Sequence, residues 1–284
     1  MVLAVRFIVR FMLDNLYNLL YNIRYTKLGA FMDKVYNLLT RERVIVVSRY
    51  NVLFELNNRI PAERAILLNI YEPKVTKTFL SLLNEDDIVV DAGAWIGYYT
   101  CLAARNALKG RVIAIEPHPE NITRLKRNII LNRFKNVDII EAGISDKESY
   151  MDLIVSDYSV MHRLNANSHN NISKNIVNNN TIKVKITTID NIAKILNIDH
   201  IDILIMDIEG YEYSALLGCN QLLSNNQIYK IIMEIHIKYL KEMQLELDDI
   251  IKLLKSYNYT IKIIDHINDS INRYHILAIK GDNS

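Results

Sequence analysis

The stretch that decides the fold of this chain reads DIVVDAGAWIG at residues 87–97. A β-branched apolar run ends in Asp91, and two glycines spaced by four, Gly93 and Gly97, follow before a helix-like stretch. Glycine lets the backbone turn tightly and come close to a bound molecule. The pattern predicts a buried strand followed by a ligand-binding turn, with contacts from Asp91, Gly93, Ala94 and Gly97.

This turn differs from the fingerprint of dinucleotide-binding proteins. That fingerprint uses three glycines, and the central one lets the backbone approach a pyrophosphate. Trp95 stands near the middle of the turn in this sequence. A ligand without phosphates therefore fits the sequence better than a dinucleotide does.

A second acidic residue follows the next apolar run. This run, RVIAIE, ends in Glu116, about 25 residues after Asp91, where a carboxylate can accept hydrogen bonds from both hydroxyls of a ribose. Two acidic strand ends with a glycine-containing turn between them are the arrangement of class I S-adenosylmethionine methyltransferases. That arrangement assigns Asp91 to the amino-acid part of the cofactor and Glu116 to its ribose.

Strand-like and helix-like segments alternate along the rest of the chain. After residues 87–91 the apolar runs are RVIAIE, VDIIEA, IDILIMD and KIIMEIH, separated by helical patterns, and the final runs YTIKIID and RYHILAIK are joined by a short polar link. Alternation of this kind predicts βαβ units with a buried parallel sheet. The fold class is therefore α/β, with a mostly parallel sheet, a C-terminal antiparallel hairpin and a helical N-terminal extension. Residues 165–180 are read as a polar loop.

Residues 1–71 are predicted to form an N-terminal amphipathic helical segment plus a short hairpin, and residues 72–284 the catalytic domain. The first 40 residues have helical amphipathic spacing, and residues 1–50 carry a net charge of +5 against −3 for the rest. This segment is interpreted as an interfacial helix on anionic lipid, a lid, or a helix packed on the domain.

Composition and charge exclude several classes of protein. Half of the 284 residues are hydrophobic and the net charge is +2, so the chain is globular and charge alone does not indicate a nucleic-acid partner. No run is long and apolar enough to predict a membrane-spanning helix. Cys101 and Cys219 lack zinc or disulfide spacing and are predicted to be buried thiols, which favours a cytoplasmic protein, with peripheral membrane contact through residues 1–40 as an option.

Several motifs together resemble the FkbM family of S-adenosylmethionine-dependent methyltransferases. They are VVDAGAWIGYYT, RVIAIEPHPENITRLKRNIILN, KVKITTIDNI, IDILIMDIEGYEYSALLG and IIMEIH. The resemblance implies a Rossmann-like doubly wound seven-stranded sheet, S-adenosylmethionine as cofactor, and methyl transfer most often to hydroxyl oxygens of sugars or polyketide-type products. Two positions depart from the family pattern, which often has asparagine where Trp95 stands and lysine where Ile205 stands.

Four side chains at two strand ends are the candidates for catalysis. Asp207 and Glu209 follow the fourth core strand, and Glu234 and His236 end the fifth. Residues two apart on an extended strand face the same side, so the four could converge. Methyl transfer to an alcohol needs an aligned acceptor and removal of its proton, for which His236 has a suitable ordinary pKa. Asp207 is also assigned to the cofactor.

The leading hypothesis is therefore O-methylation of a hydroxyl on a sugar, glycolipid or related small molecule. The resemblance requires no metal, although the same four side chains could instead hold a divalent cation. A tRNA methyltransferase is an alternative because the first two motifs also occur in tRNA-modifying enzymes, but no basic patch outside the N-terminal segment supports RNA as partner. A non-catalytic membrane-surface scaffold that retains the fold is the other alternative.

Overall fold

The structure is a computed structural model that describes residues 42–155, 163–164 and 181–281. It divides into two compact units, Met1–Pro73 and Lys74–Ser284. The amphipathic segment at residues 1–40 and the polar loop at 165–180 lie outside the described residues. Among the residues that are described, none of the helices has the length and apolar character needed to cross a membrane.

The described part of the first unit is a hairpin followed by a helix. Strands β1 (Arg43–Val47) and β2 (Leu53–Asn57) pair antiparallel, and helix α3 (Pro61–Leu67) follows. Because side chains alternate across a strand, Phe54 and Leu56 are buried on one face of the hairpin. On the other face, Arg43 and Glu55 form an ion pair.

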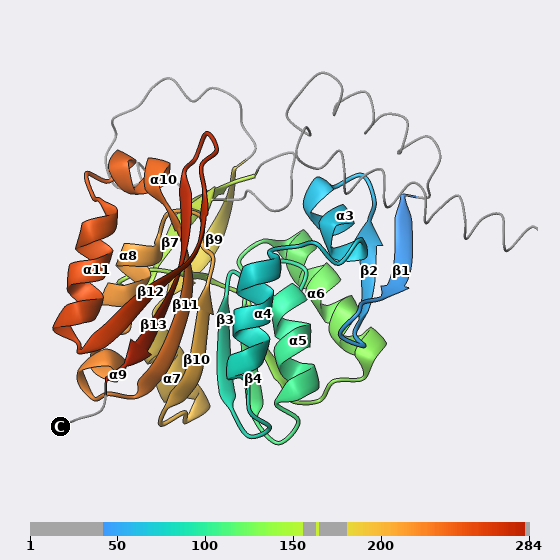
Figure 1. Cartoon of the computed structure of the whole chain (residues 1–284), viewed down its shortest axis with the longest axis horizontal. Helices are drawn as coiled ribbons and strands as arrows, with labels where there is room; N and C mark the ends of the chain where they lie inside the picture. Colours follow the sequence, from blue (N-terminus) through green and yellow to red (C-terminus); the bar gives the residue numbers. More distant parts are fainter. Residues whose placement is uncertain (1–41, 156–162, 165–180, 282–284) are drawn as a thin grey trace, which may run out of the picture. The chain divides into compact units, whose positions relative to one another are not determined.

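The second unit is built on a seven-stranded sheet (Figure 1). Its order is β12-β13-β11-β10-β3-β4-β5, parallel from β11 to β5, with β13 antiparallel to both β11 and β12. The strands are β3 (Ile88–Ala92), β4 (Arg111–Ile115), β5 (Val137–Ile140), β10 (Ile201–Met206), β11 (Ile228–His236), β12 (Tyr259–Ile267) and β13 (Arg273–Lys280). The predicted fold class, including the C-terminal hairpin, is confirmed.

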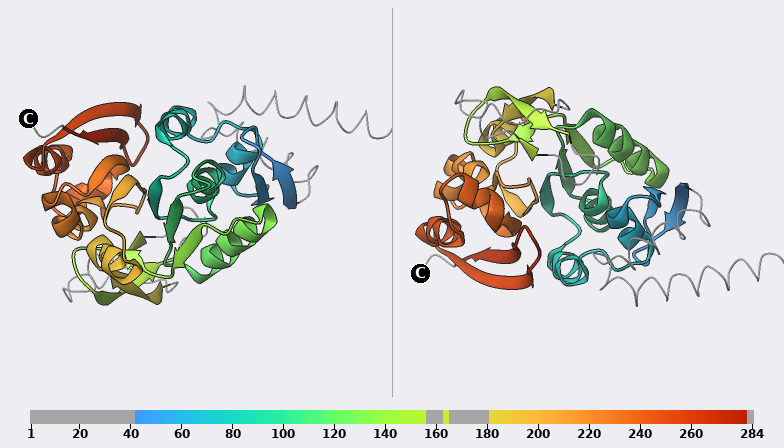
Figure 2. Two further views of the ribbon diagram at one scale, coloured as in Figure 1. Left: turned by 90° about the horizontal axis from the view of Figure 1, so that it is seen from below. Right: turned by 90° about the horizontal axis from the view of Figure 1, so that it is seen from above.

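Helices lie on both faces of this sheet (Figure 2). They are α4 (Pro73–Leu82), α5 (Tyr98–Asn106), α6 (Pro119–Asn132), α7 (Ile189–Leu196), α8 (Glu212–Leu217), α9 (Asn220–Ser224), α10 (Ile237–Glu242) and α11 (Leu247–Ser256). Helix α5 packs on β3 and β4, and α6 packs on α5. Helices α7 to α11 contribute to the large apolar cluster on the other face.

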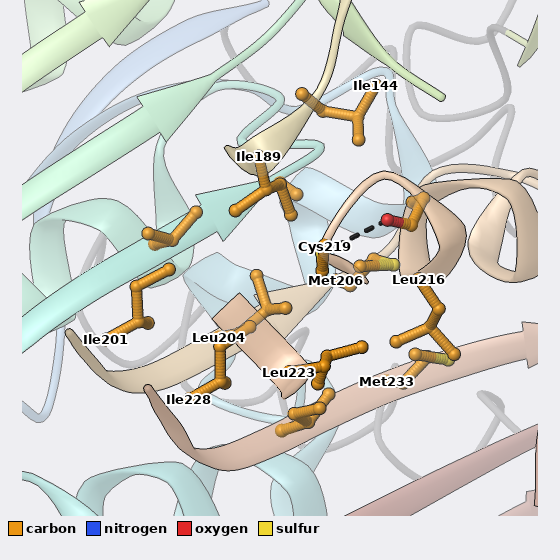
Figure 3. Close-up of a cluster of buried hydrophobic side chains, with 14 of the residues drawn as sticks. Ile144, Ile189, Ile201, Leu204, Met206, Leu216, Cys219, Leu223, Ile228 and Met233 are labelled. Carbon is orange, nitrogen blue, oxygen red and sulfur yellow. Dashed lines mark hydrogen bonds between the residues drawn. The ribbon is translucent and has the colours of Figure 1, made fainter. Parts of the chain in front are cut away.

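That cluster holds the strand ends in place. Leu204 and Met206 of β10 lie beside Met233 of β11, and Leu216 and Leu223 cover them from α8 and α9 (Figure 3). Each fully buried side chain of this size contributes roughly 1.5–3 kcal/mol to folding. The ends of β10 and β11 are therefore held by a buried apolar cluster.

Both cysteines are buried and unpaired, as predicted. The Cys219 thiol donates a hydrogen bond to the Ala215 carbonyl over 3.1 Å within the same cluster. Burial raises the pKa of both thiols, so the thiolate forms are disfavoured.

A second, four-stranded sheet was not predicted. Its order is β6-β9-β7-β8, formed by β6 (Gly143–Ile144), β7 (Ser149–Ile154), β8 (Arg163–Leu164) and β9 (Thr181–Thr187). Met151 and Val184 face a small apolar cluster, while Tyr150 and Lys185 on the other face are exposed. Apolar and polar residues alternate within these short strands, and the sequence does not indicate which strand pairs with which. Only the pairing in the folded structure identifies them as a sheet.

Candidate active site

The candidate site lies where the strand order reverses. From β3 the chain continues outward to β4 and β5, whereas β10 and β11 lie on the other side of β3. In open α/β sheets, ligands bind outside the carboxyl ends of the strands at such a switch point. The Asp207 amide donates to the Ala92 carbonyl over 3.0 Å and so joins the ends of β10 and β3.

The turn after β3 has the left-handed backbone that glycine adopts without strain. Gly93 has φ +89° and Gly97 has φ +90°, and Trp95 between them has φ +50°. A Cβ at Gly93 would lie 1.8 Å from the Asp207 carbonyl oxygen. Glycine at position 93 is therefore required by the neighbouring strand end and not only by a ligand.

Asp91 is buried at the end of β3. The Thr100 hydroxyl of α5 donates to Asp91 Oδ2 over 2.5 Å. Burial raises the pKa of Asp91 to about 6, and this hydrogen bond opposes the rise only in part. A cationic group brought next to Asp91 would stabilise its charged form.

Glu116 follows β4 and organises the turn. Its Oε2 accepts the Trp95 amide over 2.9 Å, and its Oε1 accepts the His118 amide over 2.9 Å and the Asn121 side chain over 3.3 Å. Burial raises the pKa of Glu116 to about 7 despite these bonds. Trp95, one of the two departures from the family pattern, thus holds the predicted ribose carboxylate through its backbone.

Three side chains converge at the ends of β10 and β11. His236 Nε2 lies 3.3 Å from Glu209 Oε2 and 3.8 Å from Asp207 Oδ1. The His236 side chain is 2% exposed and that of Glu209 14%, whereas Asp207 is 38% exposed. Asp207 is therefore the member of this group that an incoming molecule reaches most easily.

The route by which Glu209 arrives differs from the sequence argument. The predicted convergence needs a chain that stays extended through Glu209. In the structure β10 ends at Met206, and Glu209 has φ +53°. The left-handed turn still directs its carboxylate to His236. Burial raises the pKa of Glu209 to about 7, and the neighbouring His236 opposes the rise.

Glu234, the fourth predicted catalytic residue, has different partners. Arg273 of β13 donates to Glu234 Oε1 over 2.9 Å, and His275 Nε2 lies 3.7 Å from the same atom. Burial alone would raise the pKa of Glu234, but His236, His275 and Arg273 lower it. Glu234 therefore stays ionised in a network that ties β11 to β13.

Glu212 was not among the predicted site residues. It is fully buried at the start of α8, and its Oε1 lies 2.9 Å from His236 Nδ1 and accepts the Gly210 amide over 2.9 Å. Burial would lower the pKa of His236, but Glu209, Glu212 and Glu234 raise it well above its ordinary value. The signal was present in the DIEGYE string, whose last residue is Glu212.

Ile205, the second departure from the family pattern, is buried within β10. It lies in register with Asp91 of β3 and is 3% exposed. An apolar side chain at this place leaves Asp91 without a cation from β10, in keeping with the raised pKa of Asp91.

Comparisons with known proteins find one matching family model and several similar proteins. The Methyltransferase FkbM domain matches residues 91–261. The chain is 23% identical over 230 residues to the AMB antimetabolite synthetase AmbE of Pseudomonas aeruginosa, covering 70% of this chain and 11% of that protein. It is 21% identical over 146 residues to Methyltransferase 1 of Beauveria bassiana, covering 47% and 59% of the two chains. This chain thus spans less than two thirds of the length of either relative.

Two solved methyltransferases illustrate the likeness in fold. The methyltransferase FkbM of Methylobacillus flagellatus has a TM-score of 0.47 and 18% identity over 76% of this chain and 54% of its own. The precorrin-6y C5,15-methyltransferase of Geobacter metallireducens has a TM-score of 0.44 and 13% identity, over 74% and 89%.

The reversed strand order, the glycine turn and the acidic strand ends are those of the Rossmann-like class of S-adenosylmethionine-dependent methyltransferases. Within that class, the chain belongs to the FkbM methyltransferase family.

The residues of the turn fit this cofactor. S-adenosylmethionine carries a sulfonium and an ammonium group, and Asp91 and Glu116 are buried carboxylates whose pKa values are raised by burial. Glu116 uses three acceptor positions within the protein, and a carboxylate offers about four. Asp91 and Glu116 would therefore hold the cofactor, which supplies a methyl group activated on sulfur.

Binding of S-adenosylhomocysteine, the demethylated form of the cofactor, is expected to weaken as the pH falls below about 7. The pKa of Glu116 is raised to about 7 by burial, so acid protonates the carboxylate that must accept a hydrogen bond from a ribose hydroxyl. Each pH unit below that value lowers the affinity by up to about tenfold. Calorimetric titration at about pH 8 and about pH 5.5 measures the effect.

The matched variant is Glu116→Gln, which cannot ionise. It is expected to bind roughly tenfold or more weakly at about pH 8 and to lose the pH dependence near 7, while Asp91, whose pKa is raised to about 6, still contributes below that value. Affinities of the wild type that stay equal across this range would contradict the assignment of Glu116 to the cofactor.

Proposed function

We propose that this methyltransferase transfers the methyl group to a hydroxyl oxygen of a sugar, a glycolipid or a related small molecule. The observation that carries the proposal is the convergence of Asp207, Glu209 and His236 beside the glycine turn. Carboxylate and imidazole groups can accept a hydrogen bond from a hydroxyl and can take up its proton. Methyl transfer to an alcohol requires both steps.

An attacking hydroxyl must be aligned with the methyl carbon and must lose its proton as the new bond forms. Asp207 is the exposed member of the group, so an acceptor hydroxyl can donate a hydrogen bond to its carboxylate. The hydrogen bonds from the Asp207 amide to the Ala92 carbonyl and from His236 Nδ1 to the Glu212 carboxylate keep the surrounding groups in place. Asp207 is the proposed proton acceptor because of its position.

The charge around this group favours a neutral acceptor over a polynucleotide. Asp207, Glu209, Glu212 and Glu234 all lie near His236, and Arg273 is shared between Glu234 and Asp269. Proteins that bind RNA use basic side chains to offset the phosphates. A cluster with this excess of carboxylates would repel a phosphate backbone.

The test is methyl transfer from isotopically labelled S-adenosylmethionine to three sets of acceptors: sugars, glycolipids and total RNA. Label is expected in a sugar-containing acceptor as an ether that resists alkaline hydrolysis. Label confined to RNA would overturn the proposed acceptor class. Absence of label from every set, in a protein that binds S-adenosylhomocysteine, would also count against it.

A further inference from the structure

We propose that Asp207, Glu209 and His236 form a binding site for one divalent cation. Each offers one ligand atom, and these three atoms all lie within 4.8 Å of one another. His236 ends β11, and Asp207 and Glu209 lie in the turn that follows the neighbouring strand β10, so the parallel pairing of the two strands brings the group together. Within the described part of the second unit, this group places two carboxylates and one imidazole where the acceptor hydroxyl is proposed to bind.

One separation within the group matches that of metal ligands, and another is a few tenths of an ångström wider. Donor atoms about 2.1 Å from a common ion, at octahedral or tetrahedral angles, lie about 3.0–3.4 Å apart. His236 Nε2 is 3.3 Å from Glu209 Oε2 and 3.8 Å from Asp207 Oδ1, whereas a hydrogen bond from nitrogen to a carboxylate is about 2.7–2.9 Å. Asp207 is exposed enough to move the remaining few tenths of an ångström.

The imidazole is oriented as metal-binding histidines are. Such a histidine usually bonds its second ring nitrogen to a carboxylate or carbonyl, which fixes the direction of the ligating nitrogen. His236 Nδ1 lies 2.9 Å from the buried Glu212 carboxylate, which is itself held by the Gly210 amide. Tyr239 stacks on the imidazole with ring centres 5.6 Å apart. Nε2 is therefore directed toward Asp207 and Glu209 before any cation binds.

The local charge favours the binding of a cation. Three carboxylates, those of Glu209, Glu212 and Glu234, act on His236, and Asp207 lies beside it. Arg273, the cation nearest Glu234, is shared with Asp269. A dication placed between Asp207, Glu209 and His236 would displace the proton of the imidazole and offset the charge of the surrounding carboxylates.

The donor set suits a cation that accepts both oxygen and imidazole nitrogen, such as Mn²⁺, and three protein ligands leave coordination positions open. The chemical use of those positions rests on the proposed function, although the site itself does not. A cation bound there would lower the pKa of an acceptor hydroxyl, which would lose its proton to Asp207 more easily. The hydroxyl oxygen would then form the new carbon–oxygen bond as the carbon–sulfur bond of the cofactor breaks.

The test uses the full chain, freed of metal with a chelator and then titrated with Mn²⁺ alone, followed by electron paramagnetic resonance of the free ion. The wild type is expected to bind one Mn²⁺. Asp207→Asn and Glu209→Gln are each expected to weaken binding about tenfold or more. The matched control is Asp199→Asn, because Asp199 precedes the opposite end of β10 and its side chain is 87% exposed.

Titration with S-adenosylhomocysteine in the presence of chelator shows in parallel that each protein is folded and that its cofactor site is intact. A wild type that binds S-adenosylhomocysteine but no Mn²⁺ would overturn the cation site and leave the methyltransferase function standing. Equal Mn²⁺ affinities for Asp207→Asn and Asp199→Asn would overturn it as well. If Glu209→Gln does not fold, the comparison of Asp207→Asn with Asp199→Asn decides the question.

Discussion

Replacement of Asp207 by asparagine is expected to reduce methyl transfer at least about a hundredfold, because a positioned proton acceptor typically contributes a factor of about 10² to 10⁴. The amide has the shape of the carboxylate but not its charge or its basicity. The side chain is 38% exposed, and the backbone bond from Asp207 to Ala92 does not involve it. The change should therefore leave the protein folded, at a cost within the roughly 0.5–3 kcal/mol typical of single substitutions.

The measurement is the initial rate with the acceptor identified by the labelled-methyl assay, together with affinity for S-adenosylhomocysteine. That affinity is expected to fall by less than about tenfold, since Asp91 and Glu116 keep the turn intact. Asp199→Asn should retain the wild-type rate. A rate for Asp207→Asn within threefold of that control would remove Asp207 from the proposed chemistry.

The second large effect is expected from Gly93→Ala, which should lower the free energy of unfolding by about 2–5 kcal/mol. The left-handed backbone costs about 1–2 kcal/mol for a residue with a Cβ, and overpacking adds about 1–3 kcal/mol. The added Cβ would meet the Asp207 carbonyl oxygen at 1.8 Å. Relief of that clash displaces the end of β10, so cofactor binding should be lost as well.

Gly97→Ala separates the two causes. Gly97 has nearly the same φ, +90°, but its nearest neighbour would be the Leu125 side chain at 2.5 Å, which can move. Urea unfolding of both variants should therefore show that Gly93→Ala is the more destabilising by about 1–3 kcal/mol. Equal losses would mean that the strained backbone, and not the contact between β3 and β10, is what requires glycine at position 93.

The sequence alone predicted most of the large sheet. β-branched runs that alternate with helical patterns specify parallel strands, and the predicted strands and C-terminal hairpin agree with the structure. It did not predict the four-stranded sheet of β6 to β9, because short half-polar runs identify no partner strand until the chain has folded.

The residues of the candidate site could also be named from sequence, but not all of their local geometry. Asp91, Gly93 and Glu116 could be named from sequence because strand-end residues and turn glycines follow local rules. The Asp207, Glu209 and His236 group was named for the same reason, although Glu209 reaches it through a left-handed turn instead of an extended strand.

The sequence by itself determined the fold class, the glycine turn and the strand ends at which carboxylates gather. Only the tertiary structure decided which partner each carboxylate meets. Glu212 bonds His236 from 24 residues away, and Glu234 is held by Arg273 from 39 residues away. The physical reason is that hydrophobic periodicity acts along the chain, whereas the pairing of buried charges depends on which strand ends packing brings within a few ångströms of each other.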